Sequence, residues 1–120
     1  MHLMIDGYIT KHLDDRKALE AFVKYIASIC NMQILSGPHT VEVTDENYED
    51  GWSSVAVSKQ STIAVHMFSL ARYIYIDVFT CGQRPDIEKI VLMARGIFGL
   101  YNEQVIALPR GHQHRGQDGR

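Results

Sequence analysis

Three runs of β-branched and aromatic residues in the middle of the chain restrict the fold most strongly. They occupy residues 55–58, 63–68 and 73–79, and apolar residues recur in each with a period of two. Such alternation sends successive side chains to opposite faces of a strand. The composition and the period suit neighbouring strands of a mainly antiparallel sheet. We expect this sheet to form the centre of the fold.

Other parts of the chain also have extended character. The segments concerned are 3–9, 32–35, 40–43 and 104–108. The turn-prone pair Asp6-Gly7 interrupts the first segment, and Gly37-Pro38 separates the second from the third. The acidic, polar stretch 45–51 that follows is expected to be a loop.

Two segments carry apolar residues at helical spacing. The first follows the N-cap candidates Asp14 and Asp15 and is expected to end near Asn31. The second is expected to have Pro85 in its first turn and to stop at Gly99. Because each helix has one apolar stripe that must be buried, we predict an α+β fold, a two-layer α/β sandwich with both helices on one face of a mainly antiparallel sheet.

Length and composition predict one folded unit. The chain has 120 residues, of which 46% are hydrophobic and 22% charged, a balance that supports a buried core. We expect a single domain at 1–109 and a flexible polar tail at 110–120. His112 and His114 in this tail have no further ligands near them in sequence, so we assign no metal.

Charge and hydropathy exclude several classes of partner. The net charge of −2 with scattered Lys and Arg provides no broad basic face, so no nucleic-acid partner is expected. No apolar run is long enough to cross a bilayer and no secretory signal is evident, which predicts a cytoplasmic protein without membrane contact. Cys30 and Cys81 are too few for a disulfide framework.

The stretch 51–82 carries the most informative motifs. Gly51-Trp52-Ser53-Ser54 has the form of a turn, His66 follows Ser61 by five residues, and Asp77-Val78-Phe79-Thr80-Cys81 closes the stretch. This arrangement resembles the prokaryotic S-adenosylmethionine decarboxylases, which have a G-x-S-G turn, a Glu-Ser-His cleavage site, the same serine-to-histidine spacing and an Asp-x-Phe-Thr/Ser-Cys end. His2-Leu3 and Arg110-Gly111 extend the resemblance more weakly.

The resemblance implies a self-processing enzyme. Ser61 would attack the carbonyl of Gln60, and an N-to-O acyl shift followed by β-elimination would cut the chain between 60 and 61. The new N-terminus at position 61 would carry a pyruvoyl group, which forms a Schiff base with the substrate amine and accepts electrons as carbon dioxide leaves. Neither pyridoxal phosphate nor a metal would be required.

The resemblance also implies roles for other residues. Ser53 and His66 would assist maturation, and Cys81 would reprotonate the decarboxylated carbon. Phe68 would stack on the adenine of a small-molecule substrate, S-adenosylmethionine, in polyamine (spermidine) biosynthesis. Tyr48, by its position just before residues 51–54, is a candidate for a second stacking surface. Family members usually act as dimers, so a homodimer of processed protomers is expected.

Three departures from the family pattern keep alternatives open. Gln60 and Thr62 stand where the family has Glu and His, and Leu70 replaces a glutamate that binds ribose hydroxyls. One alternative is a pyruvoyl-dependent decarboxylase of ornithine or arginine, which would not need the ribose contact. Another is an unprocessed, non-catalytic homologue that acts as a binding or partner subunit.

Ordinary structural roles compete with functional ones at single residues. Cys30 is expected to pack in the core, and Lys59 to be solvated rather than reactive. Asp77 alternates to the face opposite Ile76, where it is either solvated or part of the site. Trp52 is either a stacking surface or a core residue.

Overall fold

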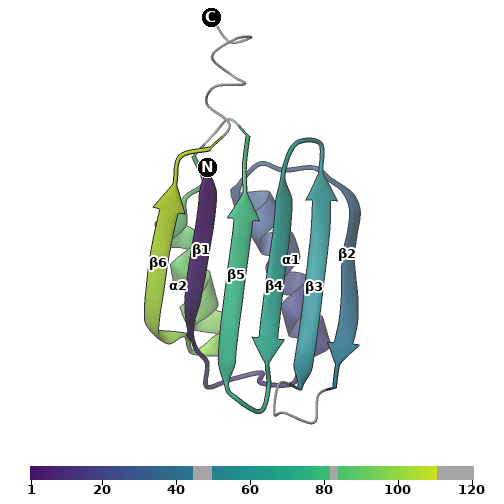
Figure 1. The fold of residues 1–120 in the computed structure, drawn as a ribbon, viewed down its shortest axis with the longest axis vertical. Helices are drawn as coiled ribbons and strands as arrows, with labels where there is room; N and C mark the ends of the chain where they lie inside the picture. The colour runs from purple at the N-terminus through teal and green to yellow at the C-terminus, as the bar shows by residue number, and fades with distance from the viewer. Residues whose placement is uncertain (45–49, 82–83, 111–120) are drawn as a thin grey trace, which may run out of the picture.

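The computed structural model describes residues 1–44, 50–81 and 84–110, and its strands form a six-stranded sheet with two helices against one face (Figure 1). The elements are β1 (His2–Tyr8), α1 (Arg16–Ile29), β2 (Ile34–Val43), β3 (Gly51–Ser58), β4 (Thr62–Phe68), β5 (Tyr73–Phe79), α2 (Ile87–Phe98) and β6 (Tyr101–Leu108). The strand order is β2-β3-β4-β5-β1-β6, and every neighbouring pair is antiparallel. The predicted two-layer α+β sandwich is confirmed.

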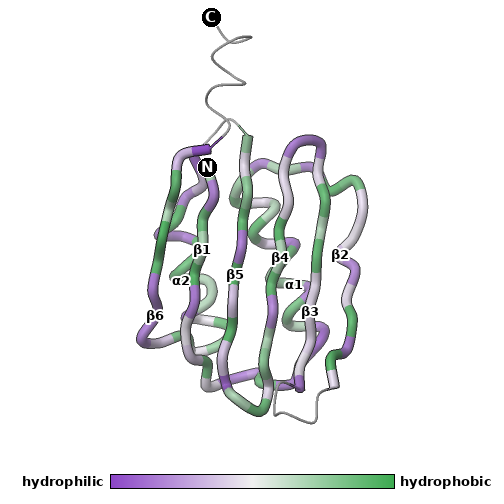
Figure 2. The backbone as a smooth tube through the Cα atoms, viewed as in Figure 1, coloured by the Kyte–Doolittle hydropathy of each residue, from purple (hydrophilic) through white to green (hydrophobic). Residues whose placement is uncertain are grey.

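The core lies between the helices and the sheet face that they cover. Apolar residues alternate with more polar ones along the strands (Figure 2), so that each central strand sends one set of side chains toward the helices. The rings of Phe22 in α1 and Phe98 in α2 are fully buried and meet edge to face, with centroids 5.3 Å apart. The predicted apolar stripes of both helices are therefore the surfaces that close the core.

Side-chain caps fix where the helices begin. The Asp15 carboxylate accepts a hydrogen bond from the Ala18 N–H at 3.0 Å, and Asp86 accepts one from the Lys89 N–H at 3.1 Å. Because Asp86 takes the N-cap position, Pro85 precedes α2 instead of lying in its first turn as predicted. The predicted stop at Gly99 is confirmed, since this residue adopts a left-handed conformation with φ 66°.

Strand pairing extends several strands beyond their predicted limits. β1 continues through Asp6-Gly7, where only its register with β6 shifts, and β2 continues across Gly37-Pro38 with register shifts against β3. β6 begins at Tyr101 instead of residue 104. Gly51-Trp52-Ser53-Ser54, predicted to be a turn, forms the first half of β3, because these residues pair with β2 on one side and β4 on the other.

The second face of the sheet is open. None of the described elements covers it (Figure 1). The side chains there come from alternate positions such as His66 in β4 and Asp77 in β5. Neither helix in the described part of the chain is long and apolar enough to span a membrane. The predicted tail lies outside the described residues except for Arg110.

We predict that Gly51→Ala severely destabilises the fold. A Cβ at this position would overlap the carbonyl oxygen of Met67 in the adjacent strand, and main-chain atoms cannot move aside without breaking the ladder. Urea unfolding followed by circular dichroism should show a loss of about 3 kcal/mol or more in the free energy of unfolding. Gly96→Ala is the matched control, because its Cβ meets no atom within 4 Å and it lies in α2. It should raise stability by about 0.5–1 kcal/mol; equal effects of the two changes would contradict the packing argument.

Candidate active site

A tight hairpin connects β3 and β4 and carries the predicted cleavage site. Val57 and Thr62 form the last ladder pair, and the Ser58 N–H donates to the Ser61 carbonyl oxygen at 2.9 Å. Lys59 and Gln60 therefore form the tip of the hairpin. The Gln60–Ser61 peptide bond lies where this tip returns into the sheet, and Ser61 itself is half-buried.

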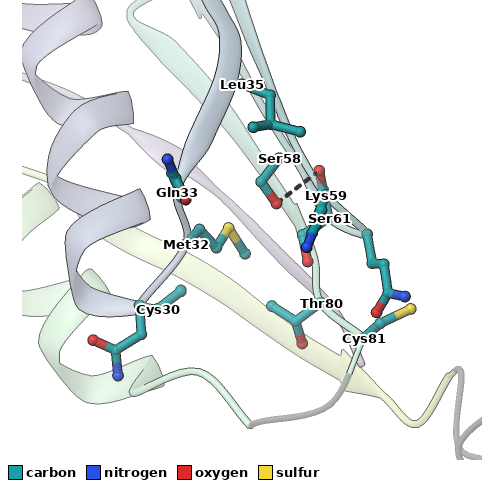
Figure 3. A pocket seen from close by; sticks show the side chains of 11 residues that line it. Cys30, Met32, Gln33, Leu35, Ser58, Lys59, Ser61, Thr80 and Cys81 are labelled. Atoms are coloured by element: carbon teal, nitrogen blue, oxygen red, sulfur yellow. Dashed lines mark hydrogen bonds between the residues drawn. The ribbon is translucent and has the colours of Figure 1, made fainter.

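A cavity of about 380 Å³ lies beside this hairpin (Figure 3). The residues that line it are Cys30, Asn31, Met32, Gln33, Leu35, Ser58, Lys59, Gln60, Ser61, Thr80 and Cys81. They come from the C-terminal end of α1, the start of β2, the β3–β4 hairpin and the end of β5. Because Thr62 pairs with Phe79, Ser61 next to Thr62 and both Thr80 and Cys81 after Phe79 reach the same cavity.

Ser53 and His66 contact each other but lie away from this cavity. The Ser53 hydroxyl and the His66 Nδ1 are 2.7 Å apart, and the two residues face each other across the β3–β4 ladder. Both side chains lie on the open face of the sheet. Five residues of extended strand place His66 about 16 Å along β4 from Ser61. Within one chain the structure therefore places Ser61 and Cys81 on the same cavity and joins Ser53 to His66, but the two pairs lie apart.

The predicted stacking residue Phe68 also lies at the other end of the sheet. Its ring packs edge to face on Tyr75 at a centroid distance of 5.4 Å, and both line a hollow on the open face together with Tyr8 and Tyr73. Within one chain, Phe68 cannot stack on a ligand bound beside Ser61. Tyr48, the second predicted stacking residue, lies outside the described residues.

The structure shows where three residues lie for which the sequence left two interpretations open. The Trp52 indole packs against the core and donates to the Asp14 carboxylate at 2.6 Å. Asp77 lies on the open face, as its alternation predicted, and its carboxylate is 2.8 Å from the His2 Nε2. Lys59 is exposed at the hairpin tip, which agrees with a solvated lysine.

Several cavity residues were not predicted. Ser58 could have been predicted from the sequence, because a hairpin with the two-residue tip Lys59-Gln60 places Ser58 opposite Ser61. Asn31 and Thr80 reach the cavity only through the packing of α1 and the pairing of β5. Cys30 packs partly against the core as expected and lines the cavity as well. No group of three or more His, Cys, Asp or Glu side chains within residues 1–44, 50–81 and 84–110 is arranged to hold a metal ion.

The Cys30 thiol is strongly biased toward its neutral form. Burial, and secondarily the negative charge of Asp86, raise the pKa of Cys30 to about 11. Burial opposes the thiolate because a charged sulfur loses hydration there. Cys30 therefore lines the cavity as a neutral, weakly reactive thiol.

The predicted cleavage site at a hairpin tip, next to a cavity that also holds a thiol, is the arrangement expected of a decarboxylase made as a proenzyme. The model of the S-adenosylmethionine decarboxylase family matches residues 1–111, and this chain belongs to that family.

Known relatives include S-adenosylmethionine and arginine decarboxylase proenzymes. The S-adenosylmethionine decarboxylase proenzyme of Thermomicrobium roseum is 22% identical over 110 residues, which cover 92% of this chain and 91% of the relative. The arginine decarboxylase proenzyme of Pyrobaculum arsenaticum is 32% identical over 84 residues, covering 67% of this chain and 59% of the relative. The crystal structure of the adenosylmethionine decarboxylase from Aquifex aeolicus matches with a TM-score of 0.74 at 16% identity, over 92% of this chain and 88% of that one.

We predict that Cys30 reacts slowly with iodoacetamide near neutral pH. With a pKa of about 11, only about one Cys30 in a thousand is a thiolate at pH 8, and the thiolate is the reactive form. In a Cys81→Ser variant, the alkylation rate of Cys30 should rise about tenfold for each pH unit between 8 and 10.

The Asp86 charge provides a control for this assignment. Asp86→Asn keeps a capping side chain but removes the charge, so alkylation of Cys30 at pH 8 should become faster. Glu88→Gln, in the same helical turn, should leave the rate unchanged. Rapid alkylation of Cys30 at pH 8 in the parent chain would show that the thiol is not held neutral.

Proposed function

We propose that this chain is a self-processing, pyruvoyl-dependent decarboxylase that acts on S-adenosylmethionine. The observation that carries the proposal is that the Gln60–Ser61 bond and Cys81 lie beside the same cavity. The bond lies at a hairpin tip, and Ser61 lines the same cavity as the thiol that would supply a proton. The family and the proenzyme relatives support the same reaction class.

The sheet is built to survive the cut. β3 pairs with β2 and β4, and β4 pairs with β3 and β5, so each new chain end stays anchored by strands on both sides. Scission at the tip removes no ladder pair. The Ser61 hydroxyl attacks the Gln60 carbonyl carbon, the peptide nitrogen leaves with a proton, and an ester joins the two segments. Elimination and loss of ammonia then convert position 61 to the pyruvoyl group.

The cavity fits this group and its chemistry. The pyruvoyl group supplies a carbonyl that withdraws electrons while carbon dioxide departs, the task that pyridoxal phosphate performs elsewhere. Cys81 holds the proton that replaces the lost carboxyl. The partly enclosed cavity limits access of bulk water to the developing charge. In this proposal neither a metal nor pyridoxal phosphate takes part.

The described cavity lining weighs against arginine as the substrate. Lys59 is the charged side chain in the described lining, and that lining contains no carboxylate. A guanidinium is usually bound by a carboxylate in a bidentate pair, which these residues cannot provide. The product would enter polyamine synthesis in the cytoplasm. Decarboxylation of arginine is the alternative function, and it is motivated by the relatives named arginine decarboxylase proenzyme.

Intact-mass spectrometry under denaturing conditions tests self-cleavage. The purified chain of 13.6 kDa should convert on incubation to residues 1–60 and a pyruvoyl-capped fragment 61–120. Ser61→Ala should remain intact, because it lacks the nucleophile. Cys81→Ser should still cleave but release far less carbon dioxide from S-adenosylmethionine. An intact parent chain would instead support the non-catalytic homologue, and cleavage of Ser61→Ala would indicate a contaminating protease.

We also propose that the protein acts as a homodimer through the open face of the sheet. Exposed apolar side chains on this face are Tyr8, Val41, Val55, Val57, Tyr75, Ile106 and Leu108. The Ser53–His66 pair lies on the same face. In a two-fold pair with reversed strand directions, the His66 end of one sheet lies over the Ser61 end of the other.

Sedimentation equilibrium tests the dimer. The parent chain should have a mass close to twice 13.6 kDa. Tyr75→Lys should shift it toward the monomer, because a charge would be buried at the centre of the face. Leu92→Lys is the matched control: Leu92 is also exposed, but on α2 on the other side of the molecule. Equal dissociation by both variants, or a parent chain that is monomeric at all concentrations, would contradict the proposed interface.

A further inference from the structure

Ser58 directs two hydrogen-bond donors at one carbonyl oxygen of the cleavage site. Its backbone N–H lies 2.9 Å from the Ser61 carbonyl oxygen, and its hydroxyl lies 3.4 Å from the same atom (Figure 3). The N–H bond belongs to the hairpin. The hydrogen bond from the hydroxyl is additional to the hairpin bond, and most other side chains at this position could not donate it.

From this geometry we infer that Ser58 is an oxyanion-stabilising residue for the elimination step of maturation. The inference rests on the proposed self-cleavage and adds a residue to it. Ser58 acts after the ester has formed, on the carbonyl of residue 61. It is therefore separate from the nucleophilic attack, which occurs at the carbonyl of residue 60.

The chemistry of elimination places negative charge on that oxygen. The Cα proton of residue 61 passes to a general base, which within one chain is not His66, because His66 lies about 16 Å along β4 from Ser61. The electron pair left on Cα is delocalised into the adjacent carbonyl of residue 61, whose oxygen becomes an enolate. The Cβ–Oγ bond then breaks, the carboxylate of Gln60 leaves, and a dehydroalanine is formed at position 61. Water later replaces its nitrogen, which departs as ammonia.

Donors already in place are effective at such a step. They stabilise charge as it develops without having to reorient, and they are strongest where bulk water is restricted. Ser58 is half-buried and lines the cavity with Ser61. Its main chain is also held from the other side, where Ser58 pairs with Ile34 in β2. The N–H donor is therefore fixed relative to the carbonyl that it contacts, and the hydroxyl is held beside the same oxygen.

The test separates elimination from ester formation. Neutral hydroxylamine cuts an ester and leaves a serine at the start of fragment 61–120, whereas elimination leaves a pyruvoyl group, and mass spectrometry distinguishes the two. Ser58→Ala keeps the N–H donor and loses the hydroxyl. Pyruvoyl formation should slow about tenfold, and the hydroxylamine-sensitive fraction should increase, because the ester still forms but waits longer for elimination.

Matched variants exclude a merely structural effect. Ser58→Thr retains the hydroxyl and should restore both the rate and the low ester fraction. Ser69→Ala removes a buried hydroxyl that has no hydrogen-bond partner within the described structure, and it should change neither quantity. If Ser58→Ala does not fold, as judged by circular dichroism, Ser58→Cys replaces it, because a thiol of similar size is a weak donor.

The outcomes are distinct. Pyruvoyl formation in Ser58→Ala at the parent rate, or slowed formation without any increase in ester, would overturn the role of Ser58 and leave the proposed function standing. A parent chain that stays intact and gives no fragments with hydroxylamine would overturn both. Slow elimination with accumulated ester, rescued by threonine, would establish the inference.

Discussion

Antiparallel pairing of β3, β4 and β5 is the constraint on which the rest of the structure depends. It places the β3–β4 hairpin and the end of β5 at the same edge of the sheet, so that Ser61 and Cys81 share one cavity although twenty residues separate them. The same ladders hold both sides of the Gln60–Ser61 bond. The proposed cut at this point would leave the fold intact, because the fold is maintained by strands that the cut does not touch.

The two faces of the sheet have different physical roles. One face is closed by α1 and α2 and supplies the buried apolar surface that stabilises the domain. The other carries tyrosines, valines and the Ser53–His66 and His2–Asp77 pairs, with no element of the described chain above it. On this face, Asp6 shows the effect of crowding: burial and the nearby charge of Asp77 both raise the pKa of its carboxyl. A partner surface would therefore meet a mixed apolar and acidic layer.

The departures from the family pattern have different consequences in three dimensions. Gln60 lies at the hairpin tip and lines the cavity, so the missing carboxylate changes the immediate surroundings of the cleavage site. Leu70 is exposed after β4, at the end of the sheet away from Ser61, and cannot affect a ligand in the same chain's cavity. Its influence on substrate choice depends on whether a second protomer brings it to the site. Ser58, in contrast, acts inside a single hairpin.

The sequence by itself determined the fold class, the two apolar helical stripes and the candidate reaction, because these depend on local periodicity and on motif spacing. It also located the helix ends closely, since Asp15 and Gly99 act within one turn of the backbone. Tertiary structure alone decided that Gly51-Trp52-Ser53-Ser54 is strand, because pairing on both sides overrides local turn preference. It also decided which site residues share a cavity. An extended strand holds Ser61 and His66 apart within one chain, while the pairing of β4 with β5 places Ser61 and Cys81 on the same cavity. Residue spacing along the sequence shows neither, because it does not show how the strands pair.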